Sequence, residues 1–365
     1  MSSNVKQKHY SKSTTYYLFL VGGMWYNIHI EREKVMLKVL ELFGGIGACT
    51  ESLKRLNIDF EVVDYVDNDK FAVKSYNAIN GTNYEVQDIR NWNKDIYADL
   101  IFHGSPCQDF SLAGKQAGGD EGSGTRSSLM YETVRIIKKV RPKYIIWENV
   151  KNVISKRHKH NFDNYITQLR LLGYYSYYKV LNAKDFGIPQ NRERVFVVSI
   201  RSDVISYGCH MINFKFPEPR KLELKLKDLL EDGVDKKYYL SEKMKKYLYS
   251  EDKKYKVNKN LLVLNRDIAC SKTTREGNTR ADTSDYICQG IDDNINLNKI
   301  VAILNNLKIR KLTPLECWRL MGFSDQSFNK TKEVNSDSQL YKQAGNSIVV
   351  DVLVEIFKNL FNMKF

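Results

Sequence analysis

The sequence predicts an α/β protein built on a mostly parallel β-sheet that helices cover on both faces. Two observations lead to this fold class. Short, nearly continuous apolar runs recur from Leu37 onward, and amphipathic segments of helical length separate them. Strands buried between two helix layers have this composition, whereas strands with one wet face alternate apolar and polar residues. The 365-residue chain is long enough for one large or two medium domains.

Predicted strands and helices alternate through the first two hundred residues. Residues 37–43 are expected to form a buried strand that ends in glycines, and a helix is expected over 49–57. A second strand at 60–67 precedes a helix at 70–79. Three later apolar runs complete the predicted sheet, at 99–105, 144–150 and 195–200. Ligands of such sheets bind beyond the carboxyl ends of the strands, so the chemistry should lie where these runs end.

The alternating pattern stops near residue 202 and returns near residue 310. The residues between are rich in lysine and irregular, which predicts a smaller separate domain. Thr313-Pro314 is expected to open a helix over 310–323, because the hydroxyl can cap it and proline suits its first turn. A loop and then an apolar helix are expected over 343–361, packed on the first domain. The predicted division is 1–35, 36–201, 202–309 and 310–365, the last completing the first domain.

Residues 1–35 stand apart from this pattern. Their apolar run, Tyr16 to Trp25, is too short to span a bilayer, and no clean signal-peptide cleavage site follows it. Met36 begins a natural first strand, and purine-only codons can encode residues 31–34, as expected for a ribosome-binding site. We therefore expect a disordered extension or a mis-assigned start, with Met36 as the true one.

Charge and cysteine usage restrict the function classes. The net charge is +14, from 57 Lys and Arg against 43 Asp and Glu, which favours a polyanionic partner, nucleic acid first. A lysine-rich composition from an AT-rich genome would give the same excess without a ligand, so charge alone leaves both readings open. The six cysteines show neither a disulfide framework nor a metal-ligand spacing. We expect a reducing, intracellular setting and no metal.

A glycine-rich turn, ELFGGIG at 41–47, joins the first predicted strand to the first helix. Such a turn lets backbone approach a nucleotide-like ligand and directs helix N–H groups at it. The dinucleotide fingerprint is incomplete, because Ala-Cys-Thr follows at 48–50. The next strand ends in Asp67, where an acid can hold ribose hydroxyls, and Asp88 ends a short later segment. Without a phosphate-binding lysine, these features predict an adenosine ligand that lacks phosphates.

Reactive side chains follow or precede three later strands at the same sheet edge. Cys107 follows the third strand, Glu148 ends the fourth, and Arg192 and Arg194 precede the fifth on one face of an extended segment. Most free cysteines act as small buried hydrophobes, so only this convergence gives Cys107 a chemical role. Thiol, carboxyl and guanidinium groups together suit a planar, hydrogen-bonding heterocycle.

With these motifs in order, the chain resembles bacterial and phage C5-cytosine-specific DNA methyltransferases, which depend on S-adenosyl-L-methionine. The resemblance runs from about Leu37 to the C-terminus. ELFGGIG resembles the family's cofactor turn and SPCQDFS its catalytic loop, followed by WENV, QNRERV, KLTPLECWRLMGF and GNSIVV. It implies a Rossmann-like S-adenosylmethionine-dependent methyltransferase domain with a mixed, mostly parallel sheet. Residues 202–309 would be its smaller, irregular target-recognition domain.

The resemblance also implies roles for matching residues. The Cys107 thiolate would attack C6 of a flipped-out cytosine, Glu148 would hold N3 and the exocyclic amine with a raised pKa, Arg194 would contact O2, and Arg192 would support the same loop. The implied cofactor residues are Phe43, Gly45, Ile46, Gly47, Asp67, Asp88, Ile89, Pro106 and Asn346. The candidates for DNA contacts are Gln108, Ser111, Arg266, Lys272, Arg275 and Arg280.

The implied reaction methylates C5 of cytosine within a specific short duplex DNA sequence and yields S-adenosyl-L-homocysteine. We expect a cytoplasmic monomer without a membrane partner, either paired with a cognate restriction endonuclease or acting as an orphan or phage methylase. A transfer-RNA methyltransferase of the same family would share the site but lack a large basic recognition domain. A nicotinamide dehydrogenase would need the complete glycine fingerprint. An inactive DNA-binding module would be expected to lose the thiol or the carboxyl.

Overall fold

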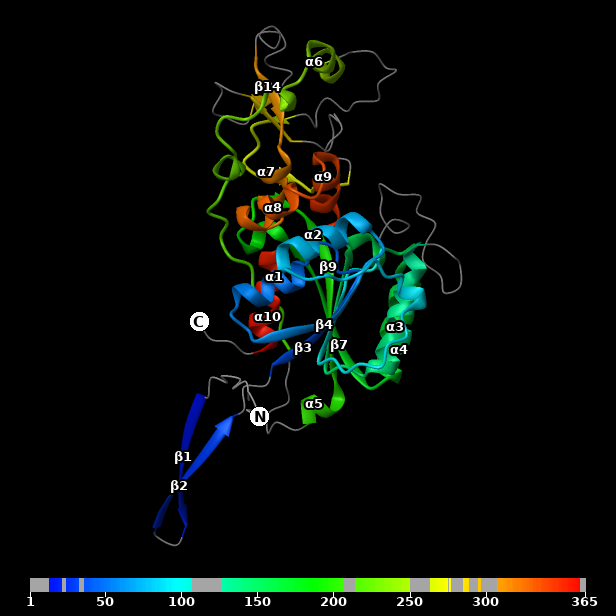
Figure 1. The fold of residues 1–365 in the computed structure, drawn as a ribbon, viewed down its shortest axis with the longest axis vertical. Helices are drawn as coiled ribbons and strands as arrows, with labels where there is room; N and C mark the ends of the chain where they lie inside the picture. Colours follow the sequence, from blue (N-terminus) through cyan, green and yellow to red (C-terminus); the bar gives the residue numbers. More distant parts are fainter. Residues whose placement is uncertain are drawn as a thin grey trace, which may run out of the picture.

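The larger part of the protein is built around a six-stranded mixed sheet (Figure 1). The computed structural model describes residues 13–21, 24–32, 36–106, 126–206, 214–249, 263–274, 276, 285–288, 295–296 and 307–361. The strands of this sheet are β3 (Leu37–Leu42), β4 (Phe60–Val66), β5 (Leu100–His103), β6 (Tyr144–Val150), β7 (Tyr174–Asn182) and β9 (Glu193–Arg201).

The strand order is β4-β3-β5-β6-β9-β7, and the four strands from β4 to β6 are parallel. Only β9 runs against its neighbours, β6 and β7. The predicted α/β class with a mostly parallel sheet is therefore confirmed. Since β9 is reversed, its first residues lie at the edge where β3 to β6 end. This edge collects the predicted site.

Helices cover both faces of the sheet (Figure 1). On one face α1 (Ala48–Arg55) packs against α10 (Val350–Leu360), and on the other lie α3 (Met130–Val140) and α4 (Lys159–Leu171). Successive strand residues point to opposite faces, so Val39 packs with the α1 and α10 layer, while Leu40 packs with the α3 and α4 layer. The return segment is thus part of the layer around α1.

The remaining helices and turns connect or extend these layers. The helix α2 (Lys70–Asn80) follows β4, with Asp69 as its N-cap. Three helices of the return segment are α7 (Pro314–Arg319), α8 (Asp325–Lys332) and α9 (Asp337–Asn346). Thr313 caps α7 in a reciprocal pair with Glu316, but the helix predicted over 310–323 is wrong in length, because strand β14 (Ile309–Lys311) precedes the cap. The other helical segments are α5 (Ser202–Ser206), α6 (Glu242–Tyr249), η1 (Ile89–Asn91), η2 (Arg126–Leu129), η3 (Lys151–Ile154), η4 (Ala183–Phe186), η5 (Leu226–Leu229) and η6 (Lys236–Tyr238).

Short strands organise the described residues of the middle region. A small sheet has the order β13-β10-β12-β14. Its strands are β10 (Val263–Leu264), β12 (Tyr286–Cys288), β13 (Ile295–Asn296) and β14 (Ile309–Lys311). A separate pair, β8 (Gln190–Asn191) and β11 (Ala269–Cys270), runs parallel. This pair ties the middle region directly to the segment that precedes β9.

The leader differs from the disordered extension that we expected. The strands β1 (Ser13–Val21) and β2 (Met24–Arg32) form an antiparallel hairpin, which pairs with none of the other described strands. Aromatic and β-branched residues are frequent in both segments and favour strand formation here. Whether translation begins at Met36 stays a prediction. No helix in the described part of the chain has the length and apolar character needed to cross a bilayer.

Candidate active site

The turn after β3 combines left-handed backbone with close packing. Phe43, Gly45 and Gly47 have φ angles of 53°, 56° and 85°, a region where glycine has no Cβ penalty. A Cβ on Gly44 would lie 2.5 Å from the Tyr65 ring, so this position has no room for a side chain. At Gly45, by contrast, no atom of the described residues lies within 4 Å of an added Cβ. The turn therefore has a packed side and an open side, which fits a cofactor approaching the backbone closely.

Asp67, at the end of β4, is hydrogen-bonded to the same turn. Its Oδ2 accepts the Gly45 N–H at 2.9 Å, and its Oδ1 accepts the Asp69 N–H at 2.8 Å. Burial raises the pKa of this carboxyl to about 6, although the two backbone N–H groups favour its ionised form. At neutral pH it is an anionic acceptor beside the glycine turn, which is the chemistry that a ribose diol needs.

The other cofactor candidates are placed less uniformly. Asp88 caps η1 and forms an ion pair with Arg90, which lowers its pKa. Ile46 and Ile89 are buried in the core, so the side chain of Ile89 offers little surface to a ligand. Pro106 is half-buried directly after the end of β5, and Asn346 is exposed at the end of α9.

A buried carboxyl and a guanidinium meet at the carboxyl edge of the sheet. Glu148 in β6 is 8% exposed, and its Oε1 lies 3.1 Å from Nε of Arg194. Burial raises the pKa of Glu148 above its ordinary value, opposed by the positive charges of Arg194 and Arg192. Gly104 at the end of β5 faces this pair, since an added Cβ would stand 3.9 Å from Oε2 of Glu148. The carboxyl is thus poised to hold or donate a proton close to where the β5 chain continues toward Cys107.

The two neighbours of Glu148 hold the segment that leads to Cys107. The Trp147 indole N–H donates to Oγ of Ser105 at 2.9 Å, and the Asn149 amide donates to the Ser105 carbonyl at 3.1 Å. His103, two residues earlier, is fully buried and bonds Tyr165, and burial lowers its pKa to about 3. Sequence reasoning missed these supporting residues. The Trp-Glu-Asn triplet was their only sequence signal.

Arg192 is placed differently from the other predicted catalytic residues. It is 3% exposed, and its guanidinium donates to backbone carbonyls: Lys272 at 2.7 Å, Ser347 at 2.7 Å and Gly345 at 3.1 Å. These contacts join segments far apart in the sequence. The guanidinium thus binds backbone carbonyls, while its positive charge also opposes the rise that burial causes in the pKa of Glu148, and its expected electrostatic support of the catalytic loop stays a prediction.

The predicted DNA contacts receive little direct support. The predicted DNA contact of Lys272 is wrong, because its side chain is fully buried. Its ammonium lies 2.5 Å from Asp285 and 3.3 Å from Glu276 and does not face DNA. Burial opposes its charge, but the two carboxylates raise its pKa above the ordinary value. Cys107, Gln108, Ser111, Arg275 and Arg280 lie outside the described residues.

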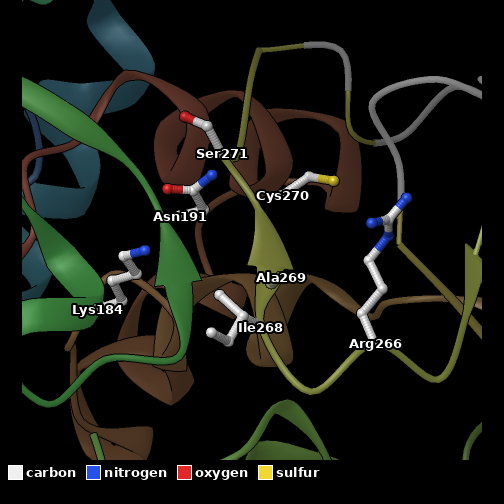
Figure 2. A pocket seen from close by; sticks show the side chains of 7 residues that line it. All are labelled: Lys184, Asn191, Arg266, Ile268, Ala269, Cys270 and Ser271. Carbon is white, nitrogen blue, oxygen red and sulfur yellow. The ribbon is translucent and has the colours of Figure 1, made fainter. Parts of the chain in front are cut away.

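Arg266 lines a half-open pocket of about 290 Å³ beside β11 (Figure 2). Its Nε lies 3.6 Å from Oδ1 of Asp285. Lys184, Asn191, Ile268, Ala269, Cys270 and Ser271 complete the lining. The pocket thus spans the catalytic part and the middle region. Among the described side chains, no three His, Cys, Asp or Glu residues gather as metal ligands.

These features place a glycine turn and a carboxyl–guanidinium pair at the carboxyl edge of an α/β sheet. A family model described as C-5 cytosine-specific DNA methylase matches residues 37–362. The chain therefore belongs to the C-5 cytosine-specific DNA methylase family, as the motif resemblance indicated.

Relatives and solved structures agree with this assignment. The type II methyltransferase M2.ScrFI of Lactococcus lactis subsp. cremoris is 34% identical, over 89% of this chain and 99% of that protein. The orphan methyltransferase M.SPRI of Bacillus phage SPR is 30% identical, over 89% and 98%. The fold is similar to that of the Entamoeba histolytica methyltransferase EhMeth, with a TM-score of 0.71 and 20% identity over 90% of this chain and 98% of that one.

Proposed function

We propose that this protein transfers a methyl group from S-adenosyl-L-methionine to C5 of a cytosine that is flipped out of a specific short sequence in duplex DNA. The observation that carries the proposal is the Glu148–Arg194 pair. The pair of a buried carboxyl and a half-buried guanidinium lies at the sheet edge where the glycine turn, Asp67 and the chain leading to Cys107 also meet. The family assignment supports the reaction class.

The glycine turn and Asp67 would hold the cofactor, which supplies an electrophilic methyl group. Backbone at Gly45 offers the open side of the turn, and the Asp67 carboxylate accepts hydrogen bonds from the ribose hydroxyls. Phe43 and Pro106 border the turn and the approach to Cys107.

The cytosine ring is activated by Cys107 and Glu148. The thiolate sulfur forms a bond to C6, and the ring electrons move toward C5 as Glu148 donates a proton to N3. C5 would then form its bond to the methyl group as the methyl–sulfur bond of S-adenosyl-L-methionine breaks and S-adenosyl-L-homocysteine leaves. A base then removes the C5 proton, the C6–sulfur bond breaks to release the thiolate, and N3 returns its proton to Glu148. Arg194 holds the Glu148 carboxyl in position and contacts O2 of the ring.

Both faces of the ring must be free for this sequence, so the base has to leave the helical stack. The net charge of +14 favours the DNA backbone. The relatives include a type II and an orphan methyltransferase. We therefore propose a cytoplasmic monomer that acts either beside a cognate restriction endonuclease or alone.

Methyl transfer from labelled S-adenosylmethionine to duplex DNA and to transfer RNA tests the proposal. We expect label in DNA with the wild-type protein, loss of transfer in Cys107→Ser, and wild-type transfer in the control Cys288→Ala, whose buried thiol lies in the small sheet. Label in RNA but not in DNA would contradict the proposed substrate and favour the transfer-RNA alternative.

A further inference from the structure

One of the contacts between the middle region and the catalytic part is a joint formed by residues 190–192 and 269–273. Gln190 pairs with Ala269 and Asn191 with Cys270 in the β8–β11 ladder. The Gln190 side chain adds two contacts: its Oε1 accepts the Lys272 N–H at 2.9 Å, and its amide donates to the Leu320 carbonyl at 2.7 Å. One short segment thus binds both the middle region and the return segment.

The guanidinium of Arg192, two residues after Gln190, adds further contacts to this joint. It binds the Lys272 carbonyl of the middle region together with the carbonyls of Gly345 and Ser347 in the return segment. At Gly345 an added Cβ would overlap the carbonyl group of Thr273, so the two backbones touch directly. A planar fork of five N–H donors can serve several carbonyls at once, which a lysine ammonium cannot do in the same geometry.

The middle region is rigid where the joint holds it. The Lys272 ammonium is fully buried between Asp285 and Glu276, and the Cys270 N–H also donates to the Asp285 carboxylate, at 3.0 Å. Breaking such a buried, paired charge is strongly destabilising. Residues 270–272 therefore cannot shift alone. A displacement at the joint moves this buried cluster as a unit.

The joint continues into the reacting site. Gln190 and Arg192 are buried and Arg194 is half-buried, whereas Asn191 and Glu193 between them are exposed, so the three side chains lie on the inner side of this segment. The first two contact the middle region, and the third pairs with Glu148 at 3.1 Å. The position of the middle region is thereby linked through the five residues 190–194 to the carboxyl that would hold the base.

We infer that Arg192 is a positioning residue, which couples the seating of the target-recognition region on DNA to the alignment of Arg194 and Glu148. The inference rests on the proposed methyl transfer and deepens it. Arg192 touches neither base nor cofactor in this account. It acts by fixing the carbonyls of residues 272, 345 and 347 relative to the segment that carries Arg194.

The variants Arg192→Lys and Gly345→Ala perturb the joint from its two sides. The control is Arg201→Lys, at the far end of β9, where the guanidinium bonds Asp203 and the Arg141 carbonyl. Displacement of reacting groups by about 1 Å can cost about 10²-fold in rate. We therefore expect both joint variants to lower the single-turnover rate by roughly 10- to 100-fold. The KM for DNA and the affinity for S-adenosylhomocysteine should stay close to wild type, and Arg201→Lys should retain the wild-type rate.

Hydrogen exchange supplies a readout that does not depend on activity. In Arg192→Lys, amides of residues 269–274 should exchange faster, while those of β3 and β5 should not. Wild-type rate and unchanged exchange in both joint variants would overturn the inference alone. A loss of both the affinity for S-adenosylhomocysteine and the single-turnover rate would also overturn the inference, because general destabilisation of the protein lowers both. A wild-type protein inactive on duplex DNA would instead refute the proposed function on which the inference rests.

Discussion

Glu148 and Arg194 show how one residue pair can serve proton transfer. A carboxyl in water is ionised at neutral pH and has no proton to donate, but burial raises the pKa of Glu148. The guanidinium of Arg194, 3.1 Å away, opposes that change. The balance leaves a carboxyl that takes up a proton more readily than a solvated one. This is the property that a donor to N3 of cytosine requires.

Replacing Glu148 by glutamine tests this role. The amide keeps the shape of the side chain but cannot release a proton, so the single-turnover rate should fall by about 10²- to 10⁴-fold. The control is Glu132→Gln, on the exposed face of α3, where the glutamate pairs with Arg135. Binding of S-adenosylhomocysteine should be unchanged in both variants. A wild-type rate in Glu148→Gln would exclude proton donation by this carboxyl.

Glu41 has a buried carboxyl that the mechanism does not use, and it makes stability depend on pH. It accepts a hydrogen bond from Thr50, its Oε2 has no partner among the described residues, and burial raises its pKa from 4.5 to about 7. The protonated form is therefore favoured in the folded state. Relative to the unfolded chain, its contribution to stability is complete below pH 4.5 and is lost as the pH rises to about 7.

Glu41→Gln should remove this part of the pH dependence. Each pKa unit corresponds to about 1.4 kcal/mol, so the variant should gain up to about 3 kcal/mol relative to wild type between pH 4 and pH 8. Urea unfolding of both proteins at the two pH values measures the difference. The same change of stability with pH in both proteins would show that Glu41 does not titrate in this range.

At the scale of elements, the turn between β3 and α1 is constrained from one side. The rings of Tyr65 and Tyr76 stack at 3.9 Å beneath it, and the Tyr65 hydroxyl donates to the Gly45 carbonyl at 2.6 Å. Gly44 rests on this pair with no room for a Cβ, while the open side of the turn lies at Gly45. The two tyrosine rings thus fix the position of the backbone that would contact the cofactor.

Gly44→Ala should therefore weaken cofactor binding. Its methyl group would lie 2.5 Å from the Tyr65 ring and displace the turn, so affinity for S-adenosylhomocysteine should fall at least about tenfold, equivalent to 1.4 kcal/mol. Gly81→Ala is the matched control: Gly81 has a φ of 67° but no described atom near an added Cβ, so only about 1–2 kcal/mol of stability should be lost. Titration calorimetry separates the two. Equal affinities in all three proteins would refute the constraint.

The sequence predicted the elements whose signals are local. Continuous apolar runs predicted β3 to β6 and β9, and Thr313 was predicted to cap α7. The strand β7 was missed because its exposed tyrosines, Tyr175 and Tyr178, break the apolar run expected of a buried strand. The contacts of Arg192 and Lys272 depend on segments far away in the sequence, so no local pattern could show that both side chains are buried.

At the scale of the whole molecule, two features bear on DNA binding: the net positive charge, and the joint between the middle region and the catalytic part. The net charge of +14 favours attraction to DNA that is independent of base sequence, whereas the joint is one of the contacts that hold the middle region on the catalytic part. Lys272, the buried lysine of the joint, forms ion pairs with Asp285 and Glu276. Contacts to DNA phosphates therefore have to come from other lysine and arginine side chains.

Binding to duplex DNA should consequently depend steeply on salt. With about 6–10 phosphate contacts, affinity should fall by about 10³- to 10⁵-fold between about 50 and 200 mM salt. Fluorescence anisotropy across this range measures the slope. A slope near zero for the wild-type protein would contradict an interface based on phosphates.

The covalent step at Cys107 is the central claim, and a trapped complex tests it most directly. A cytosine with fluorine at C5 lacks the proton whose loss expels the cysteine, so the C6–sulfur bond should persist after methyl transfer. Incubation with S-adenosylmethionine and duplex DNA carrying this base in its recognition sequence, followed by mass spectrometry, should find the nucleotide on the peptide containing Cys107. Methylation of ordinary duplex DNA without any trapped adduct, or an adduct on another cysteine, would contradict the account.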